Sequence, residues 1–251
     1  MKPRDSTQQP SFEERWRQRF ESFGRKGEND AAIAGWSTTG LETRLRNFAT
    51  HWAGDQPGAL WLDAGCGAGT YSRFMAERGL RVVAMDYSAP TIVKARDRSA
   101  APIVWCIADV NQLPVQSRSV DGAICFGVLQ ALTESEGAVR EVARAVKAGG
   151  EVWFDALNAW CLPNAWERLA RRISGKPMHL RYESGSGLKR QMRDSGLVAV
   201  RLNWLPILPV RWQRFQWLLE TTPGRALFRY VPLLGLLFSH AFVVSGRKYS
   251  P

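Results

Sequence analysis

Short apolar runs alternate with amphipathic segments through the middle of the chain. The runs have the length of buried strands, and the segments between them have the length and spacing of short helices. Strands alternating with helices predict βαβ units, and therefore a mostly parallel sheet with helices on both faces. The predicted strands are 59–62, 81–85, 103–107, 120–126 and 151–154, and the predicted helices are 71–78, 90–98 and 136–147.

The pattern changes on both sides of this region. Before it, residues 12–23 and 38–53 have apolar positions at helical spacing, and Thr39 is a candidate N-cap for the second segment. After it, the expected elements are a helix at 187–195, strands at 197–204 and 240–245, and an apolar, basic stretch with four prolines at about 205–238. We therefore divide the chain into an N-terminal helical cap (1–57), an α/β core (58–156) and a C-terminal completion of the sheet that carries a cap insertion (157–251).

Charge divides the chain at the same boundary. The net charge of the 251 residues is +11. Residues 1–156 contain 19 basic and 19 acidic side chains, whereas residues 157–251 contain 15 basic and four acidic ones. The last third of the chain is therefore suited to an anionic partner, such as a phosphate group, a membrane surface or a nucleic acid. The four cysteines form no CxxC pair and the polar N-terminal segment has no apolar signal core, so we expect a reducing, cytoplasmic setting and no metal.

The segment Leu60-Trp-Leu-Asp-Ala-Gly-Cys-Gly-Ala-Gly69 carries the most chemical information. Its glycines allow a sharp turn after a strand and a close backbone approach to a ligand. The spacing is G-x-G-x-G and not the G-x-G-x-x-G of dinucleotide sites. An acid at Asp63, inside the turn, would repel a pyrophosphate and would suit the ammonium group of a methionine moiety. The loop therefore favours an amino-acid-bearing nucleoside over NAD.

This loop resembles motif I of the class I S-adenosylmethionine (SAM)-dependent methyltransferases, and further motifs follow in the family's order between residues 58 and 155. The resemblance implies a Rossmann-like, doubly wound, mostly parallel seven-stranded α/β sheet with an antiparallel last strand. It implies N-terminal helices and a helical insertion before that strand. The implied cofactor is SAM, with S-adenosylhomocysteine (SAH) as the product. The implied cofactor-binding residues are Asp63, Ala64, Gly65, Cys66, Gly67 and Gly69 in the loop, Asp86 on the ribose, Tyr87, Ser88, Asp109 and Val110 around the adenine, and Phe126 and Gly127 beneath the cofactor.

The sequence departs from relatives at the acceptor side. Many small-molecule methyltransferases have a histidine where this chain has Ala131. Residues 155–158 also lack the Asn/Asp-Pro-Pro-Tyr/Phe signature of amino-group methyltransferases, which argues against methylation of a base nitrogen. A hydroxyl acceptor usually needs a general base. The candidates for that base are His179 and Tyr182 with Glu183 behind them, and less favourably His240, whereas His51 could cap the site.

Three functions are consistent with these features. The favoured one is SAM-dependent methylation (EC 2.1.1.-) at oxygen or carbon of a small or lipid-like acceptor in the cytoplasm, with the inner face of a membrane as one option for its location. Tryptophans, leucines and arginines between residues 204 and 238 suit a bilayer interface, a helical cap or RNA binding. The alternatives are therefore an RNA methyltransferase and a non-catalytic SAM-binding module, with a nucleic-acid partner less favoured. The sequence does not fix the oligomeric state.

Overall fold

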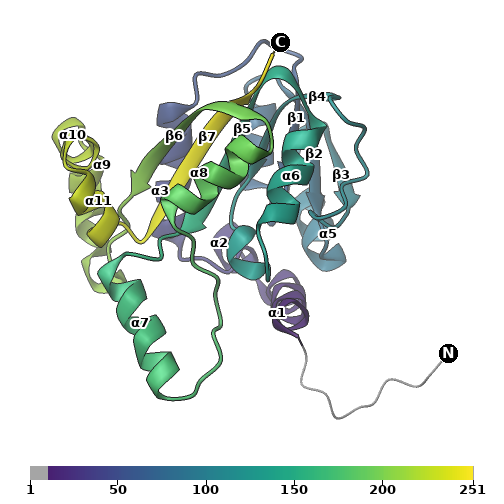
Figure 1. The fold of residues 1–251 in the computed structure, drawn as a ribbon. Helices are drawn as coiled ribbons and strands as arrows, with labels where there is room; N and C mark the ends of the chain where they lie inside the picture. The colour runs from purple at the N-terminus through teal and green to yellow at the C-terminus, as the bar shows by residue number, and fades with distance from the viewer. Residues whose placement is uncertain (1–10, 251) are drawn as a thin grey trace.

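A seven-stranded sheet, in the order β3-β2-β1-β4-β5-β7-β6, forms the centre of the molecule (Figure 1). The computed structural model describes residues 11–250, so half of the polar N-terminal segment and the last residue lie outside the described part. β7 pairs antiparallel with both β5 and β6, and the remaining pairs are parallel, as predicted. The strands are β1 (Leu60–Ala64), β2 (Arg81–Asp86), β3 (Ile103–Ile107), β4 (Val120–Cys125), β5 (Val146–Leu157), β6 (Leu197–Leu205) and β7 (Ala241–Lys248).

Helices cover both faces of the sheet, because each strand of the core presents apolar side chains in both directions. One apolar core packs α6 (Glu136–Ala145) and α8 (Gly185–Asp194) against β4, β5 and β7. The other packs α3 (Thr38–His51), α4 (Thr70–Ala76) and α5 (Ala89–Asp97) against the opposite face. Phe48 of α3 is fully buried there and contacts the rings of Trp52, Tyr71 and Trp153.

Several predicted boundaries were wrong. The helix 136–147 ends at Ala145, because Val146 pairs with Val120 and begins β5, and residues 147–150 form a bulge in that strand. α3 is capped by the Ser37 side chain and not by Thr39. Two helices were not predicted, α2 (Asp30–Ile33) and α7 (Leu162–Ile173).

Four short helical segments lie between β6 and β7. They are η2 (Val210–Phe215), α9 (Gln216–Glu220), α10 (Thr222–Tyr230) and α11 (Pro232–Phe238). α11 contacts α7, and both lie beyond the helices that cover the sheet, at the β6 side of the molecule (Figure 1). Within residues 11–250, none of the helices has both the length and the hydrophobicity needed to cross a bilayer.

Candidate active site

A cavity opens at the carboxyl ends of β1, β2 and β4, beneath α1 (Phe12–Lys26). β1 pairs with β2 on one side and with β4 on the other, so this is the point where the strand order reverses, and open α/β sheets bind ligands there. The space between its walls is about 990 Å³, the open mouth included. Most of the wall is apolar, and the polar groups that reach it include Glu13, Arg17, Asp86, Asp109 and Asn111.

The glycine loop forms one wall, and its backbone explains the glycines. Gly65, Gly67 and Gly69 have φ angles of +82°, +50° and +77°, which side chains rarely adopt. A Cβ atom on Gly65 would lie 2.1 Å from Val128, and one on Gly69 would lie 2.5 Å from the ring of Trp105. The nearest atom to a Cβ on Gly67 would be 3.9 Å away, so this position leaves room beside the cavity.

Asp86 connects this loop to the next one. Its carboxylate accepts hydrogen bonds from the backbone N–H groups of Gly67 (3.0 Å) and Ser88 (2.9 Å). Burial raises the pKa of Asp86 above its usual value, against the lowering effect of these bonds. A carboxylate has about four acceptor positions, so Asp86 can still accept hydrogen bonds from a ligand in the cavity.

Asp63 is not where the sequence argument placed it. It lies behind the loop, fully buried, and its carboxyl group accepts a hydrogen bond from Ser72 of α4 at 2.5 Å. Burial raises the pKa of Asp63 to about 7. Its carboxylate therefore does not line the cavity in which a ligand ammonium group was expected to lie. Three other predicted cofactor residues, Ala64, Gly69 and Ser88, also lie behind the wall, whereas the remaining nine line the cavity: Gly65, Cys66, Gly67, Asp86, Tyr87, Asp109, Val110, Phe126 and Gly127.

α1 forms a wall that the sequence did not assign to the site. Arg17 forms an ion pair with Asp109 at 2.6 Å, and the Tyr87 hydroxyl donates to the backbone carbonyl of Arg17 at 3.1 Å. Trp16 and Phe20 of the same helix line the cavity beside Trp36. The amphipathic spacing of residues 12–23 indicated a helix, but it gave no information about which element the helix covers.

Tyr71 also lines the cavity. Its hydroxyl group is buried and, among the described residues, has no hydrogen-bond partner. Burial raises the pKa of Tyr71 well above its usual value, so the group is a donor at neutral pH. Beneath it, Arg44 and Asp155 form a buried ion pair at 3.1 Å, and Asp155 also accepts from the backbone N–H of Gly127. A buried donor without a partner is costly, and a ligand in this cavity would satisfy it.

The predicted general bases lie outside the cavity. The Tyr182 hydroxyl donates to Glu167 of α7 at 3.3 Å, and the His179 ring lies 3.5 Å from the same carboxylate. Burial raises the pKa of Tyr182 and lowers that of His179. Burial also lowers the pKa of His240 to about 4. None of these side chains lines the cavity, nor do Glu183, which accepts from Ser135, and His51, which is exposed on α3.

Comparison with known proteins agrees with this architecture. Residues 62–154 match the family model described as a methyltransferase domain. The malonyl-[acyl-carrier protein] O-methyltransferase of Serratia marcescens is 36% identical over 118 residues, which is 45% of each chain. The ubiquinone biosynthesis O-methyltransferase of Idiomarina loihiensis is 31% identical over 160 residues, 60% of this chain and 66% of the other. The chain spans about half the length of the first of these curated relatives.

The fold itself has solved counterparts. The magnesium protoporphyrin IX methyltransferase of Synechocystis PCC 6803, solved with bound SAH, superposes with a TM-score of 0.61 at 16% identity, over 95% of this chain and all of the other. The predicted resemblance to class I SAM-dependent methyltransferases is therefore confirmed. Within that fold, residues 62–154 are the part that matches the methyltransferase-domain model.

Proposed function

We propose that this protein transfers a methyl group from SAM to oxygen or carbon of a small or lipophilic acceptor and releases SAH. One observation carries the proposal: the cavity at the strand-order reversal is lined together by Gly65, Gly67, Asp86 and Asp109. The relatives that match this region include O-methyltransferases acting on malonyl-[acyl-carrier protein] and in ubiquinone biosynthesis. Methylation at oxygen in these relatives agrees with the proposal.

The residues present fit the cofactor. The Asp86 carboxylate would accept hydrogen bonds from the two ribose hydroxyls. The Asp109 carboxylate would accept a hydrogen bond from the adenine amino group while it keeps its ion pair with Arg17. Val110 and Phe126 supply apolar surface for the base, and the backbone at Gly65 and Gly67 allows the methionine part to approach. When bound, the sulfonium would supply the methyl group. Asp63 would act from behind the loop, by holding Ser72 of α4.

The acceptor side of the cavity is apolar. Trp16, Phe20, Trp36 and Leu41 wall it together with Tyr71, whose buried hydroxyl group has no hydrogen-bond partner among the described residues. Methyl transfer depends mainly on in-line positioning and exclusion of water, which such walls provide. Because the predicted bases lie outside the cavity, we infer an acceptor whose nucleophile is already ionised or needs no base. We further propose that the protein works in the cytoplasm at the inner face of a membrane, which the basic composition of residues 157–251 supports.

Calorimetric titration with SAM and with SAH tests the cofactor assignment. We expect binding of both ligands by the unmodified protein. Asp86→Asn should weaken that binding by about tenfold or more, since hydrogen bonds to a charged acceptor contribute about 1.5–3 kcal/mol. Asp97→Asn is the matched control, because Asp97 is exposed on α5 and pairs only with the neighbouring Arg96 among the described residues. If neither ligand bound at millimolar concentration to folded protein, the proposed function would be wrong.

A further inference from the structure

The helices α7, α10 and α11 expose apolar side chains that the protein leaves uncovered. We call these three helices the helical shoulder. Trp166 and Ile173 of α7 are 71% and 77% exposed, and they lie on the same helix face as the exposed Leu162 and Leu169. Tyr230 at the end of α10 is 75% exposed. α10 buries none of its residues and α7 buries only Asn164, so neither helix gains the packing that normally stabilises an amphipathic helix.

These three helices lie next to one another. α11 contacts α7 and α10, and both α10 and α11 contact the edge strand β6, so Figure 1 shows the three helices on one side of the molecule. On α11 the exposed apolar side chains are Leu233 and Phe238, and between α10 and α11 lies the exposed Val231. Exposed apolar side chains gathered on neighbouring helices are typical of interaction surfaces.

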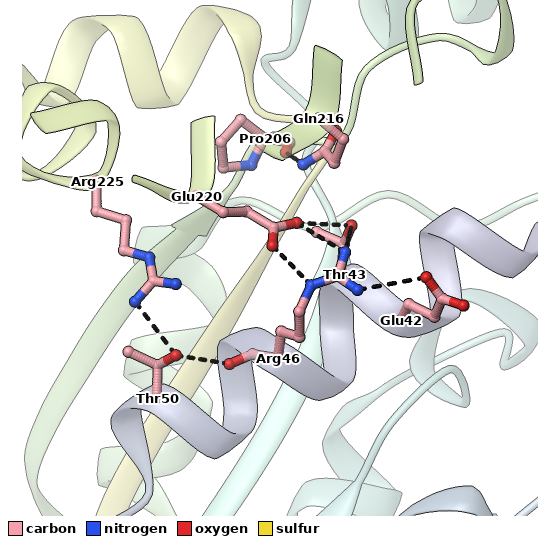
Figure 2. A network of polar contacts seen from close by, with 8 residues as sticks. All are labelled: Glu42, Thr43, Arg46, Thr50, Pro206, Gln216, Glu220 and Arg225. Carbon is pink, nitrogen blue, oxygen red and sulfur yellow. Dashed lines mark hydrogen bonds and ion pairs between the residues drawn. The ribbon is translucent and has the colours of Figure 1, made fainter. Parts of the chain in front are cut away.

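The charged side chains of the helical shoulder are almost all cations. The only acid within its three helices is Glu167, which is held by Arg171, His179 and the Tyr182 hydroxyl. Glu220, the acid of the insertion, forms an ion pair with Arg46 and accepts a hydrogen bond from Thr43, both on α3 (Figure 2). The helices of the shoulder expose the cations Arg168, Arg172, Arg225 and Arg229, and the exposed Lys176 lies shortly after α7.

We propose that the helical shoulder binds the surface of an anionic lipid bilayer. Exposed tryptophan, leucine and isoleucine would enter the boundary between headgroups and acyl chains, and the arginines and lysine would contact anionic headgroups. Trp166, with Leu162, Leu169 and Ile173 on the same face of α7, suits a bilayer interface better than a nucleic acid, which binds through stacking in a groove.

The helical shoulder is linked to the cavity through the segment that follows α7. The backbone carbonyl of His179 in this segment accepts a hydrogen bond from the Trp16 indole at 2.9 Å. Trp16 lines the cavity and belongs to α1, which covers it. A bilayer bound at α7 would therefore lie next to the segment that contacts Trp16 in the cavity wall. This position suits the delivery of a lipophilic acceptor from the bilayer to the cavity. This last step rests on the proposed function, whereas binding to the bilayer does not.

Vesicle flotation tests the bilayer proposal directly. The full chain should float with vesicles of phosphatidylglycerol and phosphatidylcholine, and much less with phosphatidylcholine alone or at high salt, where the charges are screened. The double variant Trp166→Ser/Ile173→Ser and the double variant Arg172→Glu/Lys176→Glu should each reduce the partition coefficient by about tenfold or more. All four side chains are exposed, so folding should be unaffected, which thermal unfolding checks.

Matched controls separate this surface from general charge and hydrophobicity. Tyr249→Ser removes an exposed aromatic ring that follows β7, outside the helical shoulder; Figure 1 marks the end of the chain away from α7. Arg190→Glu/Arg193→Glu makes the same charge change on α8, which covers a face of the sheet. Both controls should float like the unmodified protein. The proposal would be overturned if the unmodified protein did not float with anionic vesicles, or if the control variants lost as much flotation as the test variants. It would also be overturned if the test variants lost binding to RNA but kept flotation. SAM titration of the same variants is independent of lipid and reports separately on the proposed function.

Discussion

At the residue scale, the buried carboxyl group of Asp63 decides how the glycine loop is supported. Its bond to Ser72 joins the end of β1 to α4, so it fixes the loop from behind. Burial raises the pKa of Asp63 to about 7 and also raises those of Asp86 and Asp155. All three groups bind protons more tightly in the folded chain than in the unfolded chain. Their effect on stability is therefore favourable at low pH and is lost as pH rises through the folded pKa.

Replacement of Asp63 by asparagine should show this effect. The amide side chain of the Asp63→Asn variant would keep an acceptor for Ser72 but would have no charge to bury. As pH rises from about 4 to about 7, the free energy of unfolding of the unmodified protein should fall relative to that of Asp63→Asn, by on the order of 3 kcal/mol. Urea unfolding across this pH range measures the difference. The Asp63→Ala variant loses both the hydrogen bond and the charge, so comparison with Asp63→Asn separates the two effects. If the free energies of unfolding of the unmodified protein and of Asp63→Asn changed in parallel with pH, the expectation would be contradicted.

At the scale of elements, α3 holds the insertion between β6 and β7 in place. Glu220 of α9 accepts from Arg46 and Thr43 of α3, and Arg225 of α10 donates to Thr50 of the same helix (Figure 2). The Gln216 side chain connects Pro206 and Leu208 within the insertion. α9 and α10 bury almost none of their apolar side chains, so these polar contacts attach α9 and α10 to α3.

The attachment can be weakened at one atom pair. Glu220→Gln should speed amide hydrogen exchange in residues 208–230, because Arg46 loses its anionic partner. The free energy of unfolding should change by no more than about 1 kcal/mol, since the pair is partly exposed. Glu42→Gln is the matched control: Glu42 contacts the same Arg46 at 3.3 Å, but it lies on α3 itself. Equal exchange in both variants would show that Glu220 does not attach the insertion.

At the scale of the whole molecule, α1 and the sheet enclose the cavity from opposite sides. The ion pair between Arg17 and Asp109 and the bond from Tyr87 are partly exposed, so they hold α1 only weakly. Saturation with SAM should therefore slow amide exchange in α1 and in residues 65–70, because a ligand that binds the closed form stabilises it. α10, which the cavity does not touch, is the internal reference in the same experiment. Unchanged exchange in α1 at saturating SAM would show that this helix does not close over the cofactor.

The sequence alone determined the succession of the central strands along the chain and the turn at Gly65, Gly67 and Gly69. Strand periodicity is local, and positive φ angles select glycine whatever surrounds them. The sequence also assigned Asp86 and Asp109 to the cavity, because the carboxyl ends of parallel strands meet at one edge of the sheet. The helix spacing of α1 was visible too, although its contact with the cavity was not.

Only the tertiary structure decided which side chains reach the cavity. Asp63 and Gly69 share the loop with Gly67 but lie behind its wall, whereas Trp16 and Tyr71 reach the cavity from helices. These directions depend on how segments far apart in the chain pack against each other, which no local pattern encodes. The same holds for α7. Its apolar spacing is typical of a buried helix, but the fold leaves that face uncovered, because the sheet and its flanking helices already complete both apolar cores.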